Sequence, residues 1–254
     1  IRDRRESDLA EMMNLGGDER IYPASMTKIM TALLTIENLP DLNETITVPE
    51  DIFEELTAQD ASVAGFNPYE QPTVRDLLYG VLLPSGADAC ETLARAVGGS
   101  EEGFVAMMNQ KAEELGLTNT HFENCTGLHN DNHYSTCRDI AVLMSECLKS
   151  DTFREIVTRE VYTTEATASH PEGITLYDTM LHRFTSYEMS TTLENGAVIE
   201  GGKTGFTDEA GQCLVSFAEY GGEEYILVTA EAMTDSGSAV DSIADASTVY
   251  GRLQ

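Results

Sequence analysis

The chain has few basic residues, and this shortage narrows what it can bind. Its 254 residues include 15 Lys and Arg against 44 Asp and Glu, which gives a formal charge of -29. Such a surface repels phosphate backbones and anionic headgroups, which argues against nucleic acid as a partner and disfavours anionic membranes. The acidic residues are scattered rather than grouped in blocks. A strongly solvated surface therefore explains them better than a cation site does.

Long apolar runs are also missing. No stretch of about 18 apolar residues occurs, so no membrane-spanning helix is expected in this chain. The first residues show no basic segment followed by an apolar one, as a secretory signal would. The mature form of an exported protein has the same appearance.

Cysteine is scarce, odd in number and without a CxxC pair. Zinc sites, thioredoxin chemistry and a full disulfide framework therefore lack support. Cys125 and Cys137 are close enough for a loop bridge, although free, packed thiols are the favoured interpretation. The five cysteines are Cys90, Cys125, Cys137, Cys147 and Cys213.

Hydrophobic residues make up 41% of the chain, enough for one large domain or two interleaved lobes. Apolar residues recur at helical spacing in several segments, which end at glycines or prolines. Thr73 is a candidate N-cap. Helices are predicted over Met26–Glu37, Thr73–Leu82, Ala87–Val97, Glu101–Leu115, Ser135–Leu148 and Asp241–Leu253.

After about residue 190 the pattern changes to strands separated by glycine turns. We expect a hairpin through Gly221-Gly222 and one further strand from the first twenty residues. The plan is α+β, with helices in the middle and an antiparallel sheet towards the C-terminus. Strands are predicted over 45–50, Ala197–Glu200, Gly211–Tyr220 and Tyr225–Met233.

Two short motifs near opposite ends supply a hydroxyl and two amines. In Ser25-Met26-Thr27-Lys28 the serine and the lysine are three residues apart, so on a helix they share one face. A serine needs a base, and a lysine accepts its proton only when desolvation or another cation lowers its pKa. Lys203, in Lys203-Thr204-Gly205, is a candidate for that second cation.

The motif order Ser25-x-x-Lys28, Ser85-Gly86-Ala87 and Lys203-Thr204-Gly205 resembles that of the low-molecular-mass penicillin-binding D-alanyl-D-alanine carboxypeptidases. The likeness covers nearly the whole chain. It extends to the residues around the first and third motifs, and to Thr120-His121-Phe122 and Thr126-Gly127-Leu128-His129.

The resemblance implies a β-lactamase/transpeptidase-like fold, an antiparallel sheet flanked by helices with an interleaved all-helical lobe. We expect one catalytic domain over 1–254, with a sheet lobe from about 1–22 and 190–254 and a helical lobe from about 25–188. A β-rich second domain and a membrane anchor, common in the family, are not expected within these residues. No metal or cofactor is expected.

The implied function is removal of the terminal D-alanine from peptidoglycan stem peptides, with β-lactam antibiotics as acylating inhibitors. Ser25 is the expected nucleophile, Lys28 its proton acceptor and Ser85 the relay to the leaving D-alanine. The implied location is outside the cytoplasm of a bacterium, secreted or at the cell surface, with a role in cell-wall synthesis and cell shape.

The resemblance also assigns the substrate-binding residues. Lys203 and Thr204 are expected to bind the terminal carboxylate, and Gly205 lets the substrate backbone lie along the strand edge. The backbone N–H groups of Ser25 and Phe206 are the expected oxyanion hole.

Two positions depart from the family. Ala87 replaces the asparagine that ends the middle motif, and Asp88 would point elsewhere on a helix. Residues Thr234–Ser238 offer no cation where the family often has an arginine. Weak or altered substrate selection is therefore predicted.

Three alternatives remain. A serine β-lactamase shares the outer motifs, but no Glu-x-x-Leu-Asn stretch lies between the second and third motifs. A non-catalytic relative that binds wall peptides is conceivable because of Ala87. His129 and His133 have a spacing that chelates metal on a helix, although their turn-rich segment favours a loop.

Overall fold

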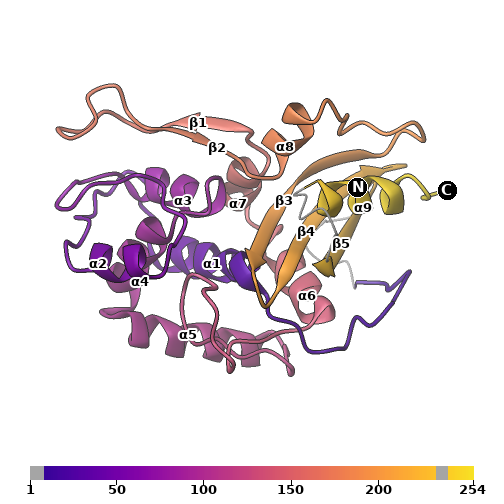
Figure 1. The fold of residues 1–254 in the computed structure, drawn as a ribbon, viewed down its shortest axis with the longest axis horizontal. Helices are drawn as coiled ribbons and strands as arrows, with labels where there is room; N and C mark the ends of the chain where they lie inside the picture. The colour runs from indigo at the N-terminus through magenta and orange to yellow at the C-terminus, as the bar shows by residue number, and fades with distance from the viewer. Residues whose placement is uncertain (1–8, 233–239) are drawn as a thin grey trace.

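The core is built around a buried helix. The computed structural model describes residues 9–232 and 240–254 (Figure 1). Helix α1 (Lys28–Asn38) is buried along Lys28 to Thr35, as suits a helix with few polar side chains. A short 3₁₀ turn, η2 (Ala24–Thr27), precedes it and carries Ser25. The predicted buried helix is confirmed, with its first turn wound more tightly than expected.

Four further helices surround α1. Each was predicted from the sequence, and the observed start and end of each lie no more than two residues from the predicted ones. The Thr73 hydroxyl accepts from the Asp76 N–H and the Asp76 carboxylate from the Thr73 N–H, so the predicted N-cap forms a complete capping box. Gly99, at φ 77°, ends its helix in the left-handed region. These helices are α3 (Val74–Leu82), α4 (Ala87–Gly98), α5 (Glu101–Glu114) and α6 (Cys137–Cys147).

Periodicity did not reveal three shorter helices. With six or seven residues each, they are too short to show a helical repeat. They are α2 (Ile52–Ala58), α7 (Asp151–Val157) and α8 (Leu181–Ser186).

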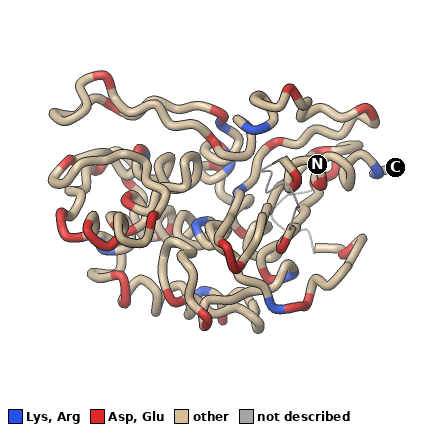
Figure 2. The backbone as a smooth tube through the Cα atoms, in the orientation of Figure 1, with Lys and Arg blue, Asp and Glu red and all other residues tan. Residues whose placement is uncertain are grey.

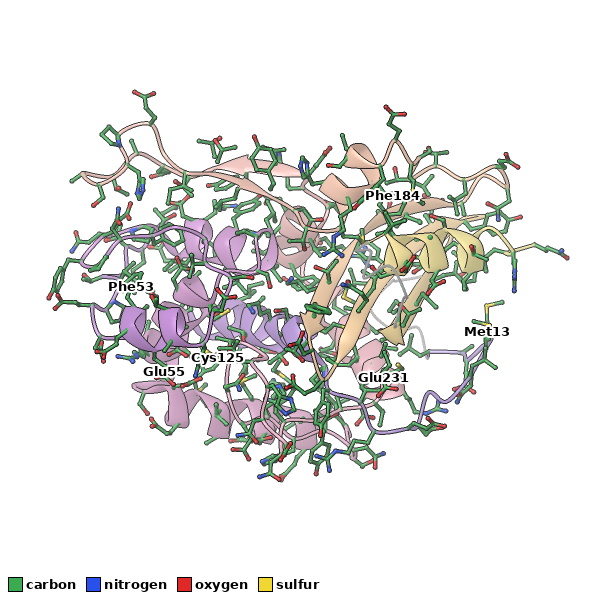
Figure 3. The ribbon with its side chains drawn as sticks, in the orientation of Figure 1. Met13, Phe53, Glu55, Cys125, Phe184 and Glu231 are labelled. Carbon is green, nitrogen blue, oxygen red and sulfur yellow. The ribbon has the colours of Figure 1, made fainter. Side chains whose placement is uncertain are left out.

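An antiparallel sheet of three strands in the order β3-β4-β5 forms the other part of the molecule, as predicted. Alternate residues of β4 face opposite ways: Val215 and Phe217 join the core around α1, whereas Leu214 and Ala218 join a second core that includes Phe184 of α8 (Figure 3). The strands are β3 (Val198–Thr207), β4 (Gly211–Tyr220) and β5 (Glu223–Ala232), and α9 (Asp241–Tyr250) packs on β4 and β5.

The strand predicted over residues 45–50 was wrong, and the strand expected from the first twenty residues is absent from their described part, residues 9–20. Residues 45–50 form only an isolated bridge, Thr45 with Thr73, because their backbone groups bond one at a time to the loop before α3. Residues 9–20 contain no strand, and Ile21 makes one isolated bridge to Ser135. Residues 1–8 and Met233 lie outside the described residues.

The segment expected to be all helical also carries a two-stranded sheet. Strands β1 (Val161–Thr163) and β2 (Thr175–Tyr177) pair antiparallel, and this hairpin runs above α3 (Figure 1). The Tyr162 ring stacks on Tyr79 of α3 at 3.6 Å between centroids. Three-residue strands give too short an alternation to be predicted from sequence.

Acidic residues cover most elements and are dense over α2 and the loops beside it (Figure 2). Among the described residues, no helix has the length and hydropathy needed to cross a bilayer. The two parts of the molecule meet where β3 packs against η2, the turn that carries Ser25.

Candidate active site

Ser25 and Lys28 face each other at the start of the central helix. The Lys28 Nζ donates to the Ser25 Oγ at 3.0 Å and to the Thr126 carbonyl oxygen at 2.6 Å. Lys28 is 3% exposed, whereas Ser25 is half-buried and open to a ligand. The amine is thus held against the hydroxyl by a second, fixed acceptor. This pair is the one that the sequence predicted.

The turn that carries Ser25 is packed against the loop at Gly127. Ala24 has a φ of 45°, a conformation that costs a non-glycine residue energy. Gly127 packs directly against it: a Cβ at Gly127 would lie 1.9 Å from the Ala24 carbonyl oxygen, and its own φ is 83°. The loop that supplies the Thr126 carbonyl therefore also supports the turn that carries Ser25.

Burial controls the charge of both lysines. It lowers the pKa of Lys28, while Cys90, Cys125 and Asp88 act in the opposite direction. Burial, reinforced by repulsion from Lys28, lowers the pKa of Lys203 to about 7. Desolvation, more than the second cation that the sequence suggested, is therefore what favours a neutral Lys28.

Ser85 lies at the end of α3 in a strained conformation. Its φ is 66°, its side chain is buried, and its Oγ has no hydrogen-bond partner within the described part of the chain. The N-cap of α4 is Gly86, not Ser85, so a capping role does not explain this hydroxyl. A buried hydroxyl without a partner is available to a bound molecule.

Asp88 does not take the place of the missing asparagine. Its buried carboxylate accepts from the backbone N–H groups of Ala64, Gly65 and Phe66, and so fastens the loop before α3 to α4. Burial raises the pKa of Asp88, against the effect of these donors. As expected, the side chain points away from the position that Ala87 occupies.

The third motif lies on β3, beside Ser25. A Cβ at Gly205 would lie 3.0 Å from both the Pro23 carbonyl oxygen and the Ser25 nitrogen, so a side chain here would require these neighbours to shift. Lys203 and Thr204 are buried, and the Lys203 Nζ donates to the Thr204 carbonyl oxygen at 3.1 Å. Phe206 follows with its side chain 54% exposed. The first and third motifs are therefore in contact.

Sequence reasoning missed the residues that link the motifs. The Thr179 N–H donates to the Leu83 carbonyl oxygen at 3.1 Å, two residues before Ser85, and its hydroxyl lies 2.6 Å from that of Thr204. Thr126 begins the family-like stretch Thr126–His129, but its contact is made by the backbone carbonyl, which a side-chain motif does not reveal. Thr179 lies outside every motif, so no local signal could have identified it.

The two histidines with metal-like spacing do not form a metal site. His133 is buried with both ring nitrogens engaged, by the Thr27 hydroxyl at 2.7 Å and the Glu123 N–H at 3.1 Å. Burial lowers the pKa of His133 to about 3. The His129 ring packs edge-on against Tyr22 instead. These histidines lie in a loop, as the turn-rich sequence indicated.

The five cysteines are free thiols, so the bridge considered for Cys125 and Cys137 is not formed. Cys125, labelled in Figure 3, has Glu91 and Glu101 as neighbours, and its thiol donates to Glu91 at 3.5 Å. Burial raises the pKa of Glu91 to about 8 and that of Cys125 well above its ordinary value. At neutral pH both groups hold their protons, so the cluster is a hydrogen-bonded one.

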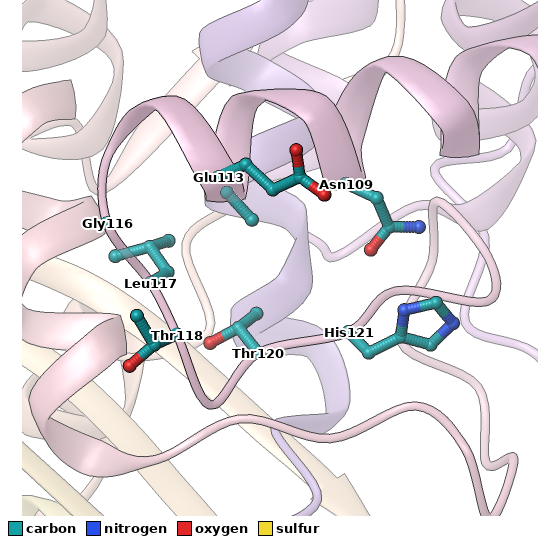
Figure 4. Close-up of a pocket in the computed structure, with 8 residues that line it drawn as sticks. Asn109, Glu113, Gly116, Leu117, Thr118, Thr120 and His121 are labelled. Carbon is teal, nitrogen blue, oxygen red and sulfur yellow. The ribbon is translucent and has the colours of Figure 1, made fainter.

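One cavity of about 330 Å³ lies between the end of α5 and the loop that follows it (Figure 4). Its polar groups are already paired: the Asn109 side chain bonds both backbone groups of Phe122, and the Thr120 hydroxyl bonds Ser135 and Asp139. None of its lining residues belongs to the three motifs.

Residues Thr234–Ser238, where the family often has an arginine, lie outside the described residues. Of the predicted site residues, the structure brings Ser25, Lys28 and the third motif together directly. Ser85 is connected to them through Leu83, Thr179 and Thr204.

Comparison with known proteins points the same way. A family model described as D-alanyl-D-alanine carboxypeptidase, peptidase S11, matches residues 12–234. The carboxypeptidase DacF of Bacillus subtilis is 35% identical over 231 residues, which cover 90% of this chain and 56% of DacF. The D-alanyl-D-alanine carboxypeptidase of Streptomyces sp. K15 is 36% identical over 217 residues, 82% of this chain and 72% of that protein.

Solved structures share the fold. The crystal structure of the Streptomyces K15 DD-transpeptidase superposes with a TM-score of 0.79 at 31% identity, covering 94% of this chain and 91% of that one. This chain spans little more than half the length of DacF, but most of the K15 protein. With a family match over most of its length and this structural agreement, the chain belongs to the D-alanyl-D-alanine carboxypeptidase family, peptidase S11.

Proposed function

We propose that the chain is a serine-type D-Ala-D-Ala carboxypeptidase that removes the terminal D-alanine of peptidoglycan stem peptides. The observation that carries the proposal is the 3.0 Å contact between the Lys28 Nζ and the Ser25 Oγ, in a site where burial lowers the pKa of the lysine. An amine that is neutral for part of the time, at hydrogen-bond distance from a hydroxyl, can accept its proton.

In the first step the Ser25 Oγ attacks the carbonyl carbon of the penultimate D-alanine, and its proton moves to the Lys28 Nζ. The negative charge that develops on the carbonyl oxygen is held by the backbone N–H groups of Ser25 and Phe206. The contact of Gly205 with the Ser25 nitrogen supports this assignment, because it keeps the two donors on neighbouring segments.

The carbon–nitrogen bond then breaks. Ser85, whose buried hydroxyl has no partner among the described residues, relays a proton from Lys28 to the nitrogen of the departing D-alanine. Water attacks the ester carbon next and gives a proton to Lys28. The ester carbon–oxygen bond then breaks, Lys28 returns that proton to the Ser25 Oγ, and the shortened peptide leaves as its carboxylic acid. A β-lactam reacts with Ser25 as the substrate does in the first step, and its opened ring stays on Ser25 as an acyl group.

Lys203 and Thr204 bind the terminal carboxylate of the substrate in this proposal. Their location on β3, the strand that contacts the turn carrying Ser25, supports this role. Because peptidoglycan lies outside the cytoplasmic membrane, the proposal also places the protein there, with a role in cell-wall synthesis and cell shape.

The test is intact-mass measurement after incubation with benzylpenicillin, together with D-alanine release from a stem pentapeptide. We expect one long-lived adduct that the Ser25→Ala variant does not form, and slow D-alanine release because Ala87 replaces the family asparagine. Rapid turnover of the penicillin would indicate a β-lactamase instead. A wild-type chain with neither adduct nor release would be a non-catalytic binder.

A further inference from the structure

The connection between β2 and α8 is a fixed structure beside the third motif. The buried Asp178 carboxylate accepts from the backbone N–H groups of Met180 at 2.9 Å and Leu181 at 2.7 Å. The Asp178 N–H itself donates to the Glu160 carbonyl oxygen at 2.8 Å. This three-residue connection, Asp178 to Met180, therefore holds Thr179 in one place.

Thr179 joins the two parts of the site. Its N–H donates to the Leu83 carbonyl oxygen at 3.1 Å, just before the strained turn at Ser85. Its hydroxyl oxygen lies 2.6 Å from the hydroxyl oxygen of Thr204 on β3. Two hydroxyls at this distance share one hydrogen bond, and each has a single proton to give.

We propose that Thr179 is a positioning residue that orients the Thr204 hydroxyl towards the carboxylate of the substrate; this inference rests on the proposed function. When Thr179 donates to Thr204, the Thr204 proton is left free to be donated to an anion. If Thr204 donates to Thr179 instead, the Thr204 oxygen presents only its lone pairs to the substrate, and these repel a carboxylate. A bound carboxylate therefore selects the first arrangement, in which each hydrogen bond strengthens the next.

This orientation matters more here because the chain has no cation over Thr234–Ser238. Carboxylate recognition then depends on Lys203 and on a correctly directed Thr204 hydroxyl. The ligand class that Thr179 serves is a peptide with a free C-terminal carboxylate, or a β-lactam with its ring carboxylate.

The test compares Thr179→Val, which keeps the shape and the backbone N–H but removes the hydroxyl, with Thr179→Ser, which keeps the hydroxyl. We expect kcat/KM for a peptide ending in D-Ala-D-Ala to fall about ten-fold in T179V, mainly through KM, and to stay within about two-fold of wild type in T179S. Thr179→Ala is a second hydroxyl-free variant, should the valine not fold.

Thr163 is a matched control. Its hydroxyl makes the same kind of contact, 3.3 Å from the Thr175 hydroxyl, on the exposed part of the β1–β2 hairpin. T163V should therefore leave kcat/KM unchanged. A double-mutant cycle separates positioning from simple structural support: T179V together with T204V should cost no more than T204V alone, because Thr179 acts through Thr204.

A T179V variant with wild-type kcat/KM would overturn the inference, and so would T179V and T204V effects that multiply. If T179S is as impaired as T179V, the hydroxyl is not the operative group and the inference is wrong. Failure of the proposed function is visible separately, in the wild-type sample, as absence of both penicillin adduct and D-alanine release. The inference then falls with it.

Discussion

The Lys28 Nζ makes two hydrogen bonds at once. It contacts the Ser25 Oγ and the Thr126 carbonyl oxygen, so its position is kept whether it holds two protons or three. An arginine at this position would keep a positive charge but could not accept a proton at any accessible pH. In the proposed mechanism the lysine is therefore needed for its lowered pKa, and a positive charge alone is not sufficient.

Replacing Lys28 by Arg should lower the rate of acylation by labelled penicillin about a thousand-fold, because the proton acceptor is lost. Lys149→Arg is the control, since Lys149 makes a surface ion pair with Glu146 at 2.6 Å and should label normally. The measurement is label incorporation against time. If the K28R variant is acylated at a rate within about ten-fold of the wild-type rate, Lys28 is not the base.

Glu91 should make stability depend on pH. Its ordinary pKa of 4.5 applies to the unfolded chain, and burial raises the folded value to about 8. The folded state thus holds a proton that the unfolded state has released between these values. The contribution of this group is fully present below pH 4.5 and is lost as the pH rises through 8.

We therefore expect the stability of wild type relative to Glu91→Gln to decrease as the pH rises from about 5 to about 8, since glutamine imitates the protonated acid at every pH. Urea unfolding at several pH values measures this difference. Glu54→Gln, at an exposed position on α2, should show no such trend. A stability difference that does not change with pH would mean that Glu91 is ionised in the folded protein.

At the scale of elements, the helices that the sequence predicted are the longer ones, each with more than two turns, whereas the missed helices have two turns or fewer. The Thr73 capping box and the glycine after α4 mark their helices from local chemistry alone. The short elements α2, α7, α8 and the β1–β2 hairpin are set by tertiary contacts such as the Tyr162–Tyr79 stack. Contacts between residues far apart in sequence leave no local pattern.

The loop at Gly127 is an element whose backbone sets the site. Replacing Gly127 by Ala should lower the free energy of unfolding by about 3 kcal/mol, because of the strain of a positive φ and the clash with Ala24. Gly116→Ala is the matched control: it has a φ of 71° but nothing within 4 Å of an added Cβ, so it should cost only about 1 kcal/mol.

Denaturant unfolding measures both variants, and penicillin labelling of G127A tests the site. We expect slower acylation in G127A at a temperature where it remains folded, because the Ser25 turn is displaced. Equal losses of stability in G127A and G116A would contradict the close packing of the loop on Ala24.

The candidate site itself was only partly predictable. Its three motifs could be identified because each is a compact run of residues, and the distance between Ser25 and Lys28 follows from helix geometry. The dominance of burial over the second cation, and the bridging contacts of Thr126 and Thr179, could not be identified. Both depend on how β3 and the loops pack around α1.

At the scale of the whole molecule, the formal charge of -29 means that the surface groups repel one another and that this repulsion lowers the stability of the folded state. Screening reduces it, so the melting temperature should rise as NaCl increases from about 10 mM to about 500 mM. Differential scanning calorimetry checks this, with a sucrose series as the control for effects that do not involve charge. A melting temperature that falls over this range would show that attractive ion pairs outweigh the repulsion.

The packing of Gly205 against the turn of Ser25 has a consequence during the synthesis and folding of each molecule. Ser25 is made on the ribosome well before β3 (Val198–Thr207), the strand that completes its surroundings. A nascent or truncated polypeptide that lacks β3 contains Ser25 but not the strand that packs against it. A covalent antibiotic label therefore reports more than the presence of an amino acid: it counts the molecules in which the late strand has already docked onto the early helix.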